Sequence, residues 1–142
     1  MTDNNHELNT VSTALVNDDL QPSRQEAWLI AQAADARKAA DIAVLQVSEV
    51  SYLADYFVIA TGFSKTQVRA IADSIEKKMA EERQKHPLRV AGKAQGSWIL
   101  LDYGDVIAHI FLPQERDFYN LEAFWGHAQR LDFQERFNPQ ES

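Results

Sequence analysis

Two short runs that are apolar on both faces of an extended backbone limit this fold more than any other feature. Residues 42–47 (IAVLQV) and 55–61 (DYFVIAT) are rich in β-branched and aromatic side chains, a composition that favours strands. A strand with two apolar faces must be covered on both sides. The sequence therefore predicts central strands of a sheet, with helices on each side.

Three segments around these strands indicate helices. A capping-box pattern at residues 23–26 precedes an alanine-rich helix over 24–39, whose narrow apolar face predicts packing at an edge of the sheet. A second capping box at residues 64–67 begins another helix, which should end before Pro87. Its apolar stripe consists of Val68, Ile71, Ala72, Ile75 and Met79. In the last helix, acids occupy the first turn, and the expected core stripe is Phe118, Leu121 and Trp125.

A hairpin lies between the second and third helices. An edge strand at 88–91 and a glycine-bounded turn at 92–96 precede strands at 98–103 and 105–112, joined at Tyr103-Gly104. With that turn, Asp102 pairs with Asp105, Leu100 with Ile107, and Trp98 with His109. These residues share one face with Phe111. The opposite face is almost wholly apolar and is assigned to the core: Ile99, Leu101, Tyr103, Val106, Ala108 and Ile110.

The first hairpin face is mixed and has two interpretations. Tryptophan is enriched in protein interfaces because it combines a large apolar area with a polar group, so this face could bind a protein partner. Alternatively, a helix covers the apolar part and leaves the acids at the exposed turn. Spacing alone favours the covered interpretation.

Composition narrows the classes of partner. The chain has no cysteine, which excludes disulfides and thiolate metal sites. A net charge of −7 argues against free nucleic acid and suits either a basic protein partner or solubility. No apolar run approaches the roughly 18 residues that span a bilayer. The first 23 residues lack Lys and Arg, unlike targeting peptides, so we expect a cytoplasmic protein.

Length and local composition predict one domain over residues 23–133, between a flexible acidic tail (1–22) and a polar tail (134–142). Two chemical sites are conceivable within this domain. Asp102, Asp105 and His109 form an acceptable metal-ligand set, but the acids flank a turn and His109 lies four residues further along, so one ion could hardly reach all three. Ser64 after Gly62 is a weak signal for anion binding, and its capping role explains it fully.

At about 100° per residue along the last helix, Arg116 and Tyr119 both point away from its apolar stripe. They are either plain surface or part of a binding patch beside the hairpin, and spacing leaves both interpretations open.

Several segments together resemble the ribosomal silencing factors, also called RsfS or Iojap proteins. They are AADIAVLQV at 39–47, DYFVIATG at 55–62, AIADSI at 70–75, WILLDYGDVIAHIF at 98–111 and RDFYNLEAFW at 116–125. The most specific part is Leu100, Gly104, His109 and Phe111, followed by FYNL at 118–121. The resemblance covers roughly residues 24–125.

The resemblance implies an α/β (α+β) fold: a mixed sheet of about five strands flanked by helices, similar to a nucleotidyltransferase domain without its catalytic set. It implies a protein that binds the large ribosomal subunit through its fourteenth large-subunit protein and blocks joining of the small subunit, which represses translation when nutrients are scarce. It implies no cofactor, no metal and no enzymatic activity.

Carried over residue by residue, the resemblance places a set of side chains at the ribosomal-protein contact or in support of it: Tyr56, Trp98, Leu100, Asp102, Tyr103, Asp105 and His109. Arg116 and Tyr119 are second choices. Tyr103 falls on the core face of the hairpin, so it could reach a partner only from the tip of the turn. Gln46 departs from the family, which usually has an acid there, and is expected to loosen a connector contact. Ala91 replaces the Glu that commonly precedes Gly92.

Two further hypotheses remain. The related fold and the pair Asp102/Asp105 raise a metal-dependent nucleotidyltransferase as the alternative function. That chemistry usually needs two carboxylates one residue apart on a strand face, whereas these acids are three apart across a turn and Phe63 separates Gly62 from Ser64. The mixed face could also close a homodimer in the free protein.

Overall fold

A mixed sheet of six strands organises residues 21–137, which are the residues that the computed structural model describes. Its spatial order is β3-β4-β5-β2-β1-β6. The strands are β1 (Ala40–Gln46), β2 (Tyr56–Thr61), β3 (Arg89–Ala91), β4 (Trp98–Asp102), β5 (Val106–Phe111) and β6 (Gln129–Leu131). β2 and β5 pair in parallel, and every other neighbouring pair is antiparallel. The predicted fold class is confirmed, with β6 as a strand that the sequence did not indicate.

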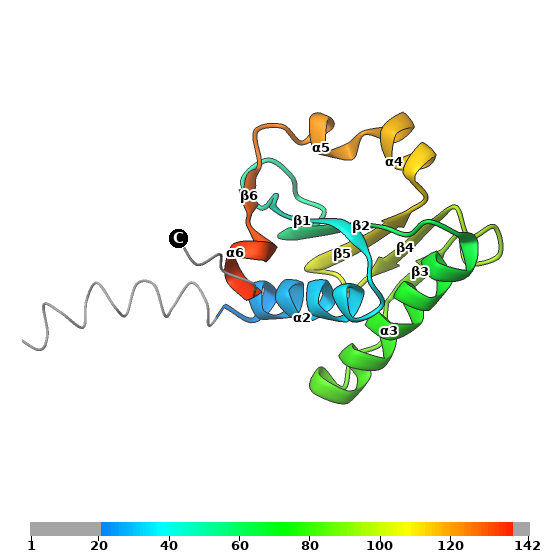
Figure 1. Cartoon of the computed structure of the whole chain (residues 1–142). Coiled ribbons are helices and arrows are strands. Elements are labelled where there is room, and N and C mark those ends of the chain that lie inside the picture. The colour runs from blue at the N-terminus through cyan, green and yellow to red at the C-terminus, as the bar shows by residue number, and fades with distance from the viewer. Residues whose placement is uncertain (1–20, 138–142) are drawn as a thin grey trace, which may run out of the picture.

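Helices cover the sheet on both sides. α2 (Pro22–Ala36) and α3 (Lys65–Arg83) lie below it in Figure 1, and α4 (Pro113–Tyr119) and α5 (Leu121–Phe124) lie above it. Every residue of β2 and β5 is buried, and β1 lies inside the sheet between β2 and β6. The expected internal position of the two apolar runs is therefore confirmed. The predicted tails lie largely outside the described residues.

The position of α2 differs from the prediction. It contacts β1, β2, β5 and α3, and its four completely covered residues are Ala27, Ile30, Ala31 and Ala34. The edge position was wrong because alanines, which add little to an apolar stripe, let a helix approach a sheet closely. The capping box at Ser23 was also wrong. The helix begins at Pro22 after Gln21 without a side-chain cap, and the Glu26 carboxylate accepts from Lys85 Nζ at 2.7 Å.

The start of α3 confirms the second cap and corrects one detail. Ser64 Oγ accepts a hydrogen bond from the Gln67 backbone N–H at 3.0 Å. The Gln67 side chain accepts from the N–H of Phe63 at 2.7 Å, not from Ser64, and its amide donates to the carbonyls of Arg37 and Lys38. The predicted apolar stripe is the buried face of this helix, which ends before Pro87 as expected.

The hairpin turn lies one residue later than predicted. Tyr103 N–H donates to Val106 O at 2.9 Å, which places Gly104 and Asp105 in the turn. Gly104 adopts φ +90°, and its N–H donates to Asp102 Oδ1 at 2.8 Å. The cross-strand pairs are Trp98–Phe111, Leu100–His109 and Asp102–Ile107. The predicted partners were wrong by two residues, an even displacement that leaves each strand residue on its predicted face.

The last predicted helix is broken into α4 and α5 by Asn120, whose φ of +45° ends the helical run. Phe118 is 80% exposed, so its assignment to the core was wrong, because helical periodicity does not continue across the break. Leu121 and Trp125 do pack against the sheet. The chain then forms β6 and α6 (Phe133–Phe137), where Phe137 contacts Trp28 with ring centroids 5.5 Å apart.

Candidate functional site

A row of aromatic side chains crosses the upper face of the sheet. The Trp98 ring lies 4.6 Å from Tyr119 and 4.8 Å from Phe111, measured between centroids. Trp98 Nε1 donates to His109 Nδ1 at 3.2 Å. Phe57 continues the row, 5.1 Å from His109 and 5.5 Å from Trp125. α4, β4, β5 and β2 thus hold Trp98 and its neighbours in one packed layer.

His109 supports this layer as a neutral ring. An indole N–H can only donate, so Nδ1 of His109 is the unprotonated acceptor and Nε2 carries the hydrogen. Nε2 has no hydrogen-bond partner among residues 21–137. Burial lowers the pKa of His109 from its ordinary 6.5 to about 4, because the charged ring would lose its hydration. His109 is only 6% exposed, so it holds Trp98 from beneath and presents little surface to a partner.

The mixed hairpin face is covered along β5 and open along β4. His109, Ile107 and Phe111 are buried, whereas Trp98, Leu100 and Asp102 are half-buried. Beyond Trp98, Tyr119 is 48% exposed, and the ring of the exposed Phe118 lies 5.0 Å from that of Tyr119. We call Trp98, Leu100, Phe118 and Tyr119 the β4–α4 surface. The covered interpretation is therefore right for β5, whereas β4 is left open and its binding of a protein partner stays a prediction.

Arg116 lies where helical spacing did not place it. Its side chain is 11% exposed and turns back to the sheet, where Nη1 donates to Thr61 Oγ1 at 2.8 Å. Its Nε donates to Glu122 Oε1 at 2.9 Å. Burial alone would raise the pKa of Glu122, but the bonds and charges of Arg116 and Arg130 outweigh it and lower that pKa. The plain-surface interpretation of Arg116 was wrong.

Tyr56 and Tyr103 belong to the opposite layer of the sheet. Both are buried in the core cluster between the sheet and the helices α2 and α3. Tyr56 Oη accepts from Arg24 Nε at 3.0 Å. The Tyr103 hydroxyl has no partner within the described residues, and burial, aided by the charge of Glu76, raises its pKa. The structure does not bring these two side chains together with Trp98.

The two hairpin acids lie at the end of the β4–α4 surface. Asp102 caps the turn through Gly104 and lies 3.5 Å from Arg89. Asp105 is exposed at the tip of the turn. Within residues 21–137, no group of three or more His, Asp and Glu side chains is arranged to hold a metal ion. Asp102 and Asp105 belong to no such group within these residues, and Ser64 serves as the cap of α3.

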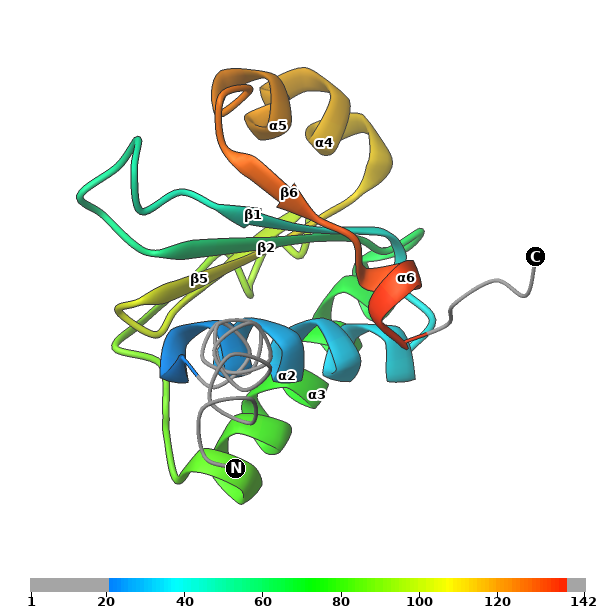
Figure 2. The same cartoon turned by 90° about the vertical axis from the view of Figure 1, so that its left-hand side faces the viewer.

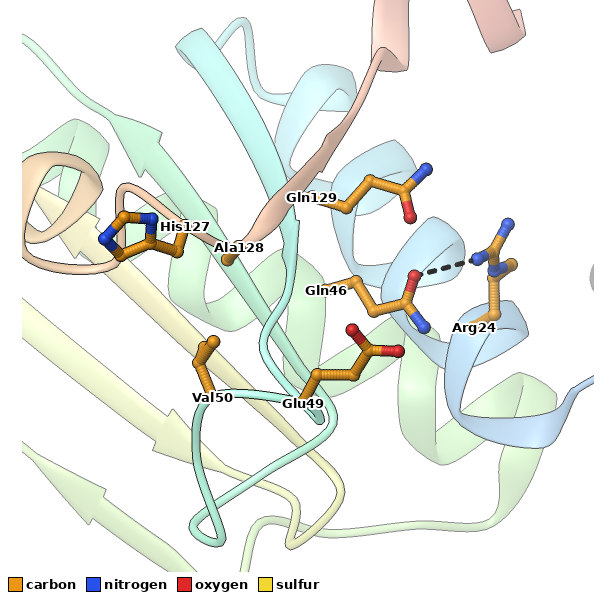
Figure 3. A pocket seen from close by; sticks show the side chains of 7 residues that line it. All are labelled: Arg24, Gln46, Glu49, Val50, His127, Ala128 and Gln129. Atoms are coloured by element: carbon orange, nitrogen blue, oxygen red, sulfur yellow. Dashed lines mark hydrogen bonds between the residues drawn. The ribbon is translucent and has the colours of Figure 1, made fainter.

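A polar cavity of about 370 Å³ lies between the start of α2, the end of β1 and the start of β6 (Figure 3). Its lining consists of Arg24, Gln46, Glu49, Val50, His127, Ala128 and Gln129. Arg24 Nη2 donates to Gln46 Oε1 at 3.2 Å, so at this departure from the family the charged guanidinium of Arg24 binds an uncharged amide oxygen instead of a carboxylate. Glu49 is the only carboxylate in this lining, which therefore has no carboxylate pair for metal-assisted chemistry.

Sequence reasoning missed Thr61 and Glu122, which bind Arg116. Thr61 and Arg116 are 55 residues apart, so no local pattern could have linked them.

In the described part of the chain, no helix is both long enough and apolar enough to cross a membrane.

The sequence is similar to a known protein family and to several of its members. The family model described as "Ribosomal silencing factor during starvation" matches residues 20–142. The ribosomal silencing factor RsfS of Halalkalibacterium halodurans is 40% identical over 113 residues, 79% of this chain and 96% of that protein. The chloroplastic protein Iojap of Zea mays is 45% identical over 105 residues, 72% of this chain and 44% of its own length.

A crystal structure of a protein from Chromobacterium violaceum has the same fold. It superposes with a TM-score of 0.72 at 33% identity, covering 84% of this chain and 98% of that one. The resemblance found in residues 24–125 is confirmed, and the chain belongs to the ribosomal silencing factor family.

Proposed function

We propose that this protein binds the large ribosomal subunit in the cytoplasm, through the fourteenth large-subunit protein, and blocks joining of the small subunit without catalysing a reaction. The observation that carries the proposal is the β4–α4 surface, where half-buried Trp98 and Leu100 adjoin exposed Phe118 and Tyr119. The names of the relatives, ribosomal silencing factors, supply the class of partner.

The geometry of Trp98 suits an interface residue. Contacts with Tyr119, Phe111 and His109 hold its ring before any partner arrives. Preorganised aromatic side chains lose little conformational entropy on binding, and large aromatic residues dominate many interfaces. When a partner covers the exposed edge of Trp98, little of the binding free energy of that contact is therefore lost to ordering the ring.

Charge on this side of the molecule complements a ribosomal protein. Asp105 at the turn and Asp117 on α4 are exposed, and Asp102 is half-buried beside Leu100. A protein embedded in RNA needs a basic surface, and opposite charge increases the rate of association. In this proposal, Trp98, Leu100 and Tyr119 contact the partner and the aspartates form the rim. His109 and Arg116 support the surface from within, whereas Tyr56 and Tyr103 pack in the opposite layer of the sheet.

Cosedimentation with purified large subunits tests the proposal, with small-subunit joining followed by light scattering. We expect Trp98→Ala to weaken binding about 30-fold or more, the range of interface hot spots. Asp102→Lys should also weaken it, whereas Glu82→Lys on α3 makes the same charge change on the opposite layer and should leave it intact. Binding that survives Trp98→Ala and Asp102→Lys together would refute this surface. Absence of wild-type binding would refute the function.

The same surface is proposed to close a homodimer in the free protein, because it is the apolar part of the sheet face left open. Dimer and ribosomal contact would then compete. Sedimentation at two protein concentrations should show association that Trp98→Ala reduces, and a strict monomer at both concentrations excludes the dimer.

A further inference from the structure

The segment that carries half of the β4–α4 surface has little core of its own. Residues 112–131, which we call the arch, run from the end of β5 through α4 and α5 to β6, above the sheet in Figure 2. Neither α4 nor α5 contains a fully buried residue. The ends of the arch are tied, because Leu112 N–H donates to Ser97 O at 2.9 Å and β6 pairs with β1.

A polar network ties the middle of the arch to the sheet. Arg116 from α4 donates to buried Thr61 at the end of β2 and to Glu122 of α5. Glu122 accepts a second bond, from Arg130 Nη1 of β6 at 2.8 Å. Hydrogen bonds that involve charged groups are stronger and more directional than neutral ones, and partial burial shields them from water. The network therefore joins three consecutive elements of the arch, α4, α5 and β6, to β2, whose Thr61 lies 55 residues before Arg116.

We propose that Arg116 is a positioning residue that sets the β4–α4 surface in place, and that it does not touch the partner. Arg116 and Tyr119 are three residues apart on α4, so they lie on the same side of the helix. With the guanidinium bound to Thr61, the next turn of the helix holds the Tyr119 ring 4.6 Å from Trp98. The meaning of this role for binding rests on the proposed function.

Thr61 offers a way to separate positioning from direct contact. It is 3% exposed, so it cannot reach a partner. Thr61→Val keeps the shape and β-branching of the side chain but removes the acceptor of Arg116, whereas Thr61→Ser restores the acceptor. Arg116→Gln removes the charge and the forked donor and leaves Glu122 with Arg130.

The experiment compares these variants in the full-length protein. Two-dimensional NMR follows the nuclear Overhauser effects between the Trp98 and Tyr119 rings, and cosedimentation follows binding to large subunits. We expect Thr61→Val and Arg116→Gln to lose the ring-to-ring effects and to bind about tenfold more weakly, the change expected for one charge-assisted hydrogen bond. Thr61→Ser should retain both, while the hydrogen-exchange protection of β2 and β5 stays unchanged in all three.

Intact Trp98–Tyr119 effects in Thr61→Val and Arg116→Gln would overturn the positioning role, whatever happens to binding. Lost effects with unchanged binding would overturn its part in recognition and leave the proposed function standing. If the wild-type protein does not bind large subunits, the proposed function fails, and the NMR comparison still decides whether Arg116 positions Tyr119.

Discussion

Acidification from pH 7 to pH 5 should destabilise this protein through His109. The ring is buried and neutral, with a pKa of about 4, whereas a histidine in the unfolded chain titrates near 6.5. Above pH 6.5 both states are neutral and no difference arises. Below it, the unfolded chain takes up a proton that the folded protein refuses, so stability falls as the pH falls towards 4.

The size of the effect follows from these two pKa values. Each unit of difference corresponds to 1.36 kcal/mol, so the complete loss, reached below pH 4, is about 3 kcal/mol. At pH 5 most of the unfolded histidine is charged and most of the folded one is neutral, so about 2 kcal/mol is lost. That is a large share of the roughly 5–15 kcal/mol that stabilises a typical domain.

Urea denaturation at pH 7 and pH 5 measures this loss. His109→Asn is the matched variant, because its amide oxygen can still accept from Trp98 Nε1 but does not titrate. The variant should be less stable at pH 7, since it leaves part of the ring's space empty. Its free energy of unfolding should then change by less than about 0.5 kcal/mol between the two pH values if His109 is the main source of the slope.

Two results would contradict this reasoning. One is an equal loss of stability in the wild type and in His109→Asn. The other is an NMR titration in which the pKa of the His109 ring lies near the ordinary 6.5 instead of near 4.

Further substitutions test the fold by urea denaturation. Gln67→Ala removes the hydrogen bonds to Phe63, Arg37 and Lys38 and should lower the free energy of unfolding by about 1–3 kcal/mol. The control is Ser64→Ala, which removes the cap alone and should cost about 1 kcal/mol. If Gln67→Ala costs no more than this control, the three hydrogen bonds contribute little. Gln46→Glu converts the bond from Arg24 into an ion pair and should add about 0.5–1 kcal/mol; the same gain in an Arg24→Ala background would disprove that cause. Gly92→Ala, at φ +87°, would place a Cβ 1.9 Å from Trp98 O and should destabilise by more than about 3 kcal/mol. Gly104→Ala, at φ +90° with 3.4 Å to its nearest neighbour, should lose only about 1–2 kcal/mol, and similar losses at the two glycines would reject the steric argument.

Local patterns predicted those features that depend on neighbours in the chain. The buried stripe and the serine cap of α3 follow from a 3.6-residue period and one turn of backbone. The hairpin shows how robust such a period can be. The partners were wrong by two residues, yet Trp98, Leu100 and His109 lie on the predicted face, because a displacement of two restores the alternation of a strand.

Tertiary structure alone decided which half of that face is open. The arch covers β5 and leaves β4 half-buried, and its path depends on the break at Asn120 and on pairing between β6 and β1. Arg116 faces inward because Thr61, 55 residues earlier, supplies its acceptor. Tyr56 is likewise buried only because α2 packs closely against the sheet through its small alanine side chains. Sequence determined the buried face and serine cap of α3 and the two faces of the hairpin strands, because these are local. The covering of one element by another was decided only in three dimensions, because it depends on where distant segments return to the sheet.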